Sequence, residues 1–336
     1  MDIAYKPSII TVLAALLITL TASSQPFGLV LHGGAGTITK EGLSPERQKE
    51  YEAVMEEALA KGFELLDNGH PADEAVVETI KILEDHPLFN AGKGSVLNVN
   101  GAVEMDASIM LGKDLNAGAV AGVQRVRHPI EAARAVMLNS PHVLMSNAGA
   151  DAFAQTQGLQ MEDPDYFVTE KSKERLENAQ KRAKEQGNLE SEPADWKYGT
   201  VGVVALDLAG NLAAGTSTGG MTNKMHNRIG DSPIIGAGTY ANNESCGVSC
   251  TGHGEYFIRL NIAHEVSALM RYKGMSVQEA GDKMLHEELE KLGGAGGLIA
   301  LDKDGNISMP FNTPGMFRAF HMSDGRKEIL MFKDSE

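Results

Sequence analysis

The stretch Gly199-Thr200-Val201-Gly202-Val203-Val204-Ala205-Leu206-Asp207 stands where the character of the chain changes. A charged segment from Thr169 to Lys197 precedes it and shows no apolar periodicity. The apolar run after Thr200 is typical of a buried β-strand, and a turn around residues 209–211 closes it. A chain cut between Gly199 and Thr200 would gain an N-terminal threonine, whose hydroxyl is a nucleophile and whose α-amine is a base. The simpler alternative is that Gly-Thr only begins a strand.

Composition narrows the class of protein. The chain has 336 residues, enough for one large domain or two modest ones with a sizeable core. Its formal net charge of −15 argues against a nucleic-acid partner, because phosphates attract lysine and arginine. The 37 glycines gather in short loops between apolar strands, so a low-complexity chain is not indicated.

The N-terminus has the pattern of a signal peptide. Lys6 precedes an apolar run, Ile9 to Leu20, and small residues follow it up to Ser24. We expect residues 1–24 to be removed and the mature protein to be exported to the periplasm. The run is short for a membrane span, which needs about 20 residues; an uncleaved anchor is the alternative. Cys246 and Cys250 would lie ~13 Å apart in an extended strand, so we expect small core residues and no disulfide.

The expected elements alternate between strands and helices and predict two stacked sheets covered by helices. Ser44 and Pro45 form an N-cap and N1 pair for a helix that stops at Asn68-Gly69. Expected strands are 27–32, 96–98, 102–110, 117–123, 201–207, 212–217, 234–238 and 246–250; expected helices are 45–67, 71–83, 129–138, 145–157, 255–272 and 277–292. The segment from about 160 to 199 is expected to be an exposed linker without an apolar stripe to hold it to a core.

Two loops stand out by their residue types. His32-Gly33-Gly34-Ala35-Gly36 is not a dinucleotide fingerprint, since the Gly-x-Gly-x-x-Gly spacing is absent. Glu84 to Gly94 could hold a cation through its carbonyl groups, although the pattern alone favours a plain helix-to-strand connection.

The sequence lacks the motifs of several common catalytic mechanisms. The histidines lack zinc-ligand spacing, and neither a Gly-x-Ser-x-Gly elbow nor a Walker A loop is present. What remains is a set of threonines next to glycine at strand edges: Thr200, Thr218 and Thr251. Thr251-Gly252 could offer a hydroxyl and an N–H group to an oxyanion, or could be an ordinary turn.

Arg228 and Asp231 lie three residues apart in a glycine-flanked loop. Arginine binds a carboxylate with two parallel hydrogen bonds, and aspartate binds an ammonium group, so the pair suits an α-amino acid head group. A local surface ion pair is the alternative.

Seven motifs of the sequence resemble those of one protein family. The chain resembles the plant-type asparaginase / isoaspartyl peptidase family of N-terminal nucleophile hydrolases over nearly all of the mature sequence. The motifs that carry it are Gly199-Thr200-Val201-Gly202, Thr216-Ser217-Thr218-Gly219-Gly220-Met221-Thr222-Asn223-Lys224, Arg228-Ile229-Gly230-Asp231-Ser232-Pro233, Gly236-Ala237-Gly238-Thr239-Tyr240-Ala241, Ser249-Cys250-Thr251-Gly252-His253-Gly254-Glu255, His32-Gly33-Gly34-Ala35-Gly36 and Leu88-Phe89-Asn90-Ala91-Gly92.

The resemblance implies an α+β fold, a four-layer αββα sandwich that is one domain made of two subunits. The precursor would cut itself into an α subunit, 25–199, and a β subunit, 200–336, that assemble as (αβ)2. Thr200 would be the nucleophile and Thr218 its hydroxyl neighbour. Arg228 and Asp231 would hold the substrate's α-carboxylate and α-amine, and Thr251 with Gly252 would form the oxyanion hole. Cofactors are not implied, apart from a structural sodium ion on the carbonyl groups of Leu83, Glu84, His86, Phe89, Ala91 and Lys93.

The implied activity is hydrolysis of isoaspartyl dipeptides and L-asparagine to aspartate, with no membrane or nucleic-acid partner. Glycosylasparaginase activity is the nearest alternative, but its acidic Gly-Asp-Gly-Asp-like turn is replaced here by Gly252-His253-Gly254-Glu255. His253 stands where relatives often carry a small residue or lysine. A periplasmic amino-acid-binding protein that never matures is the alternative from another class.

Overall fold

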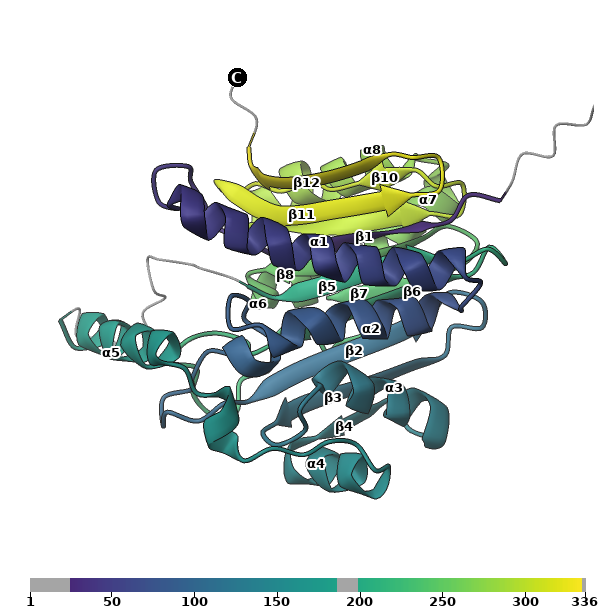
Figure 1. The fold of residues 1–336 in the computed structure, drawn as a ribbon. Helices are drawn as coiled ribbons and strands as arrows, with labels where there is room; N and C mark the ends of the chain where they lie inside the picture. Colours follow the sequence, from purple (N-terminus) through teal and green to yellow (C-terminus); the bar gives the residue numbers. More distant parts are fainter. Residues whose placement is uncertain (1–24, 186–198, 334–336) are drawn as a thin grey trace, which may run out of the picture.

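A computed structural model of the chain describes residues 25–185 and 199–333 and contains two β-sheets with helices packed on them (Figure 1). The protein is therefore mixed α and β, as the sequence predicted. The larger sheet has, in spatial order, β12 (Lys327–Phe332), β11 (Gly315–Met322), β1 (Gly28–Gly36), β5 (Val201–Leu206), β6 (Leu212–Thr218), β2 (Met105–Leu111), β3 (Ala117–Val123) and β4 (Leu144–Ser146). The smaller sheet has β10 (Ile307–Ser308), β9 (Gly296–Asp302), β8 (Cys246–Gly252) and β7 (Thr239–Ala241).

The two sheets pack against each other through β1, β5 and β6 of one and β8 and β9 of the other. Helices α1 (Pro45–Asp67), α2 (Ala72–Asp85) and α3 (Pro129–Asn139) pack on the larger sheet, and α7 (Ile262–Lys273) and α8 (Val277–Asp282) pack on the smaller one (Figure 1). Alternation along β5 divides the core: Val203 and Ala205 join the cluster under α1 and α2, while Val204 and Leu206 join the cluster between the sheets.

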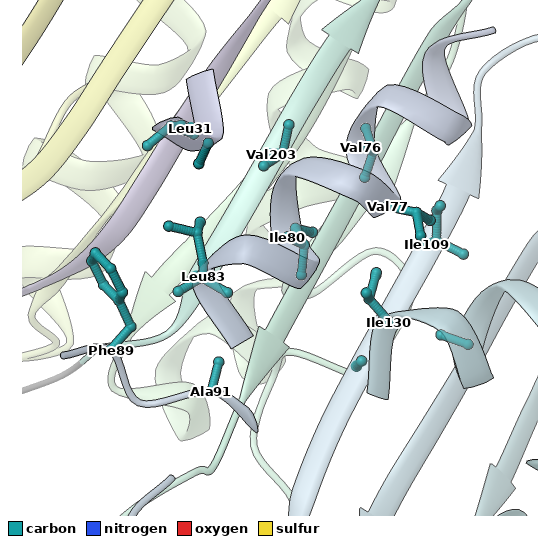
Figure 2. Close-up of a cluster of buried hydrophobic side chains, with 14 of the residues drawn as sticks. Leu31, Val76, Val77, Ile80, Leu83, Phe89, Ala91, Ile109, Ile130 and Val203 are labelled. Carbon is teal, nitrogen blue, oxygen red and sulfur yellow. The ribbon is translucent and has the colours of Figure 1, made fainter. Parts of the chain in front are cut away.

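The helical cover of β5 follows directly from the sequence pattern. Ser44 caps α1 by accepting a hydrogen bond from the Arg47 N–H, and Pro45 opens the first turn, as predicted. Helix α2 buries Val76, Ile80 and Leu83 against the strands (Figure 2). The loop after α2 continues this packing, because Phe89 and Ala91 also point into the cluster (Figure 2).

Some predicted elements are wrong in detail. Strand β1 does not end at His32 but continues through the glycines to Gly36. Glycine is required there because neighbouring side chains lie close to the strand: a Cβ on Gly33 would lie 2.4 Å from the Phe89 ring. Residues 96–98 and 234–238 are not strands, although the turn at Asn100-Gly101 exists. Met145 belongs to β4, and only Asn147–Thr156 forms α4. The long helix expected after Glu255 is broken at Asn261, whose φ is 50°, into α6 (Gly254–Leu260) and α7. The helix expected over 277–292 is α8 followed by a π-helical run, η3 (Lys283–Leu289).

The expectation of an unpacked linker is also wrong for its described part. Residues after α4 form two helical pieces, η2 (Pro164–Phe167) and α5 (Glu170–Glu185). Phe167 is fully buried, and Leu176 anchors α5 to the core cluster under α1. The buried residues of α5, Ser172, Leu176 and Ala183, are too widely spaced to form a continuous apolar stripe, so the sequence pattern did not predict that the helix packs on the core.

The cysteines, the N-terminal segment and the membrane span were also subjects of prediction. Cys246 and Cys250 are both free and buried, as predicted. The predicted signal peptide, 1–24, and residues 186–198 of the predicted linker lie outside the described residues. Among the described helices, none has the length and apolar character of a membrane span.

Candidate active site

The Gly199–Thr200 peptide bond lies at the entrance to β5, near the middle of the larger sheet. Strand pairing sets Val201 opposite Ser217, which brings the preceding Thr200 next to Thr218 at the end of β6. Their side-chain oxygens are 2.9 Å apart, and both residues are buried. The hydroxyl of Thr218 also accepts a hydrogen bond from the Gly220 N–H at 3.0 Å. Either hydroxyl can donate the hydrogen bond that joins Thr200 and Thr218.

His32 of β1 holds the main chain of Thr200 in place. One ring nitrogen, Nδ1, lies 3.0 Å from the Thr200 carbonyl oxygen, and Nε2 lies 3.0 Å from Ser249 Oγ. Burial lowers the pKa of His32 to about 3, against a smaller opposing effect of the Thr200 carbonyl, so the ring is neutral at pH 7. A neutral ring has one N–H, which must be on Nδ1 to donate to the carbonyl, so Nε2 accepts from Ser249. Sequence reasoning assigned His32 no role beyond its place in a glycine-rich loop.

Asn90 holds the carbonyl group of the Gly199–Thr200 peptide bond. Its N–H donates to the Gly199 carbonyl oxygen at 2.9 Å, and its side-chain amide donates to the Gly220 carbonyl at 2.7 Å. Its side-chain oxygen accepts from the Val96 N–H at 2.9 Å, so the side chain is fixed. A Cβ on Gly199 would lie 2.6 Å from the Asn90 nitrogen, so only glycine fits there without displacement. The signal for Asn90 was present in the Leu88–Gly92 motif, but residue type alone gave it no role.

Arg228 and Asp231 do not form the surface ion pair that was the simpler interpretation of their spacing. Arg228 instead makes a two-bond ion pair with Glu255 of α6, with Nε and Nη2 at 2.8 and 2.7 Å from the carboxylate oxygens. Burial is the largest single effect and would lower the pKa of Arg228, but the hydrogen bond and charge of Glu255, together with the charges of Asp231 and Asp106, outweigh it, so the net shift is upward. Glu255 is a residue that spacing alone did not single out.

Asp231 is buried and 5 % exposed, and its Oδ2 atom has no hydrogen-bond partner within the described chain. Burial raises the pKa of Asp231 to about 7, although the Arg228 charge opposes the rise. A Cβ on Gly254 would lie 2.8 Å from Arg228 Nη2 and 2.9 Å from Asp231 Oδ1, so the cation and the carboxylate approach the same point. A buried carboxylate oxygen without a donor is suited to receive an ammonium group.

These residues share one small cavity of about 20 Å³. The site residues that line it are Thr200, Thr218, Arg228, Asp231 and Gly252. Thr251 is not part of this lining; it is fully buried in β8, and its hydroxyl accepts a 3.4 Å hydrogen bond from the Ala35 N–H. The structure thus brings together five of the six predicted site residues around this cavity, and Gly252 is the residue of the predicted oxyanion pair that lines it.

A second set of buried charges lies behind the turn after β6. Lys224 donates to the Glu104 carbonyl oxygen at 2.6 Å and lies 3.7 Å from a Glu104 side-chain oxygen, with 1 % of its side chain exposed. Burial lowers the pKa of Lys224, while Asp106 and Glu104 oppose the change. Asp106 lies on β2 opposite Thr218 and accepts from the Gly122 N–H at 2.8 Å, which supplies the partner that a buried carboxylate in a strand requires.

The predicted sodium loop wraps closely on itself between α2 and η1 (Gly92–Gly94). A Cβ on Gly92 would lie 2.3 Å from the Glu84 carbonyl oxygen, and one on Gly94 would lie 1.9 Å from that of Phe89. These two carbonyls thus face positions that only glycine can occupy. The chemistry of the donors suits a hard cation, which prefers oxygen ligands. Asn90 belongs to this loop, so a cation that ordered the loop would also order the contact with Gly199.

The site combines a buried threonine hydroxyl, a Gly–Thr peptide bond fixed by hydrogen bonds, an arginine, and a carboxylate oxygen without a partner among the described residues. A hydrolase with a threonine nucleophile and an amino-acid substrate requires these groups. The comparisons with known proteins agree with this class. A family model described as asparaginase matches residues 24–331. The chain therefore belongs to the asparaginase family.

Curated relatives show how similar the chain is within that family. It is 49 % identical over 294 residues, 87 % of this chain and 94 % of the relative, to the isoaspartyl peptidase of Salmonella typhimurium, and 48 % identical over 294 residues, 87 % and 92 % of the two chains, to that of Escherichia coli. It is 44 % identical over 282 residues, 84 % and 88 % of the two chains, to the human isoaspartyl peptidase/L-asparaginase.

Proposed function

We propose that the protein is a self-cleaving amidohydrolase that releases L-aspartate from isoaspartyl dipeptides and from L-asparagine. The observation that carries the proposal is the 2.9 Å contact between the Thr200 and Thr218 hydroxyls in a cavity that Arg228 and Asp231 also line. Relatives at 44–49 % identity that carry the names isoaspartyl peptidase or L-asparaginase support the substrate class. Their names do not favour the glycosylasparaginase alternative.

Maturation follows from the held peptide bond. The Thr200 hydroxyl attacks the Gly199 carbonyl carbon, and the Asn90 N–H stabilises the negative oxygen that forms. The C–N bond then breaks, the nitrogen takes a proton and becomes the Thr200 α-amine, and the acyl group passes to the hydroxyl oxygen. Water hydrolyses this ester. The products are an α subunit, 25–199, and a β subunit, 200–336.

Hydrolysis repeats this chemistry on a substrate. The Thr200 α-amine, with a reference pKa of about 7.7–8.0, accepts the hydroxyl proton near neutral pH. Arg228 binds the substrate's α-carboxylate and Asp231 its α-amine, which leaves the side-chain carbonyl facing Thr200. The Thr251 hydroxyl and the Gly252 N–H stabilise the oxyanion. Ammonia or an amino acid leaves, and water releases aspartate from the threonine ester.

The finer architecture and surroundings belong to the same proposal. Helices on both sheets support a four-layer αββα sandwich of the N-terminal nucleophile hydrolase type. We propose that two αβ units pair as (αβ)2 and that a structural sodium ion binds the loop carbonyls of Leu83, Glu84, His86, Phe89, Ala91 and Lys93. The N-terminal pattern supports a signal peptide over residues 1–24 and a periplasmic enzyme.

The test starts from the mass of the purified chain. The wild type should separate into two fragments with Thr200 at the new N-terminus, and Thr200→Ala should stay intact and inactive. Thr156→Ala, on an exposed turn of α4, is the matched control and should cleave normally. The cleaved enzyme is then assayed on isoaspartyl-leucine, L-asparagine and a glycosylated asparagine. Cleavage of the Thr200→Ala chain would refute the nucleophile, and a wild type that stays in one piece would favour the binding-protein alternative.

A further inference from the structure

A second cavity, of about 370 Å³, reaches the Gly199–Thr200 bond from the Gly199 side. Gly199 and Asn90 line it, whereas Thr200 and Thr218 line the small cavity that holds Arg228 and Asp231. The two cavities therefore meet the same peptide bond from its two ends. Cleavage gives the Gly199 end the freedom to move away, and the larger cavity then adjoins the new Thr200 amine.

The larger cavity has a strong bias of charge. Its lining includes Arg47 of α1 and Arg175 of α5, and none of its described lining residues is acidic. Arg47 has a partner in Glu50, at 2.7 Å. Arg175 is partly buried beside the Tyr51 phenol, and no hydrogen bond or ion pair to an acidic group is recorded for it among the described residues. Burial lowers the pKa of Arg175, Tyr51 opposes this and Arg47 adds to it, yet a guanidinium keeps its charge at neutral pH.

The side on which the leaving group lies follows from the proton transfer between the Thr200 amine and the departing nitrogen. The Thr200 amine takes the hydroxyl proton and must pass it to the departing nitrogen, so that nitrogen lies within hydrogen-bond reach of the amine. Before cleavage, the same nitrogen forms the peptide bond with the Gly199 carbonyl carbon. Since the head group is held on the Thr218 side by Arg228 and Asp231, the leaving group extends to the Gly199 side, into the larger cavity.

We propose that this cavity is the leaving-group subsite and that Arg175 binds the α-carboxylate of the amino acid released from an isoaspartyl dipeptide. The inference rests on the proposed function and goes further, since it names a residue that distinguishes the two substrates. The dipeptide's departing group carries a carboxylate, and the guanidinium can bind it through two hydrogen bonds. L-Asparagine releases ammonia, which leaves nothing for Arg175 to hold. The residue thus favours dipeptides without taking part in the chemistry.

The experiment compares wild type with Arg175→Gln on three substrates: isoaspartyl-leucine, its C-terminal amide and L-asparagine. Losing a charge-assisted hydrogen bond should lower kcat/KM for isoaspartyl-leucine by about tenfold or more, mainly through KM. Kinetics on L-asparagine should be unchanged, and the dipeptide amide should be a poor substrate for both enzymes. Arg175→Lys, which keeps the charge, should recover part of the loss.

Lys173→Gln is the matched control, because it removes one positive charge from the exposed face of the same helix. It should leave all three substrates unaffected. An equal loss on L-asparagine and on the dipeptide in Arg175→Gln would mean that Arg175 only supports the fold, and it would overturn the inference. Equal rates on the dipeptide and its amide in wild type would do so as well, and are expected if the new Gly199 carboxylate occupies Arg175. A cleaved wild type that hydrolyses none of the substrates would refute the proposed function, and the inference with it.

Discussion

Asp231→Asn should make the protein more stable and less active, and the gain in stability should depend on pH. Burial raises the pKa of Asp231 from 3.8 to about 7, so between these values the folded carboxyl is protonated while the unfolded one is ionised. The folded state then binds more protons, and its stability falls as the pH rises towards the folded value. The asparagine variant has no such loss.

The size of the effect follows from the two pKa values. Between about pH 5 and pH 8 the free energy of unfolding of the wild type should fall by about 2–3 kcal/mol relative to Asp231→Asn. For a chain of this size the difference corresponds to a few degrees in melting temperature. The assay is thermal unfolding at both pH values in the uncleaved Thr200→Ala background. Asp304→Asn, in the exposed turn between β9 and β10, is the matched control for the loss of a carboxylate at the surface.

The same substitution should cost activity in the cleaved enzyme. An amide cannot neutralise the substrate's ammonium group, so KM for L-asparagine should rise by about tenfold or more. A variant that is no more stable than wild type at pH 8, or that is stabilised equally at pH 5, would refute the assignment of a burial cost to Asp231. An unchanged KM would refute its contact with the substrate.

Three further perturbations test the remaining contacts. Gly199→Ala places a Cβ 2.6 Å from the Asn90 nitrogen and should slow self-cleavage, followed as the decay of the intact mass; Gly158→Ala, which meets no neighbour although its φ is positive, should cleave at the wild-type rate. Glu255→Gln weakens the bidentate pair that orients Arg228 and should raise KM for L-asparagine with little change in kcat; an effect on kcat alone would contradict this role. His32→Phe leaves the Thr200 carbonyl oxygen without this donor, while Ser249 Oγ keeps its 2.6 Å hydrogen bond with Thr216, so stability should fall by about 1–3 kcal/mol. The substitution should also slow cleavage, and a variant that melts and cleaves like wild type would exclude His32 as a positioning residue.

Local sequence signals were reliable where neighbouring residues decide the structure. The Ser44-Pro45 start of α1, the β5–β6 hairpin after Thr200 and the free cysteines were predicted correctly because caps, turns and strand patterns act over a few residues. The packing of helix α5 on the core was missed for the opposite reason. Its few buried residues, such as Leu176, gain their contacts from distant parts of the chain.

By itself, the sequence determined which residues could react: a threonine after a glycine at the start of a core strand, an arginine and an aspartate three residues apart, and a glycine-rich loop. Only the tertiary structure decided how they are used. It paired Arg228 with Glu255 and brought Asn90 to the Gly199 carbonyl. Among the residues that the structure describes, it also left a buried oxygen of Asp231 without a donor and put Arg175 in a cavity with no acidic lining residue. These properties depend on burial and on contacts between residues far apart in the chain, and both exist only after the two sheets and their helices have packed.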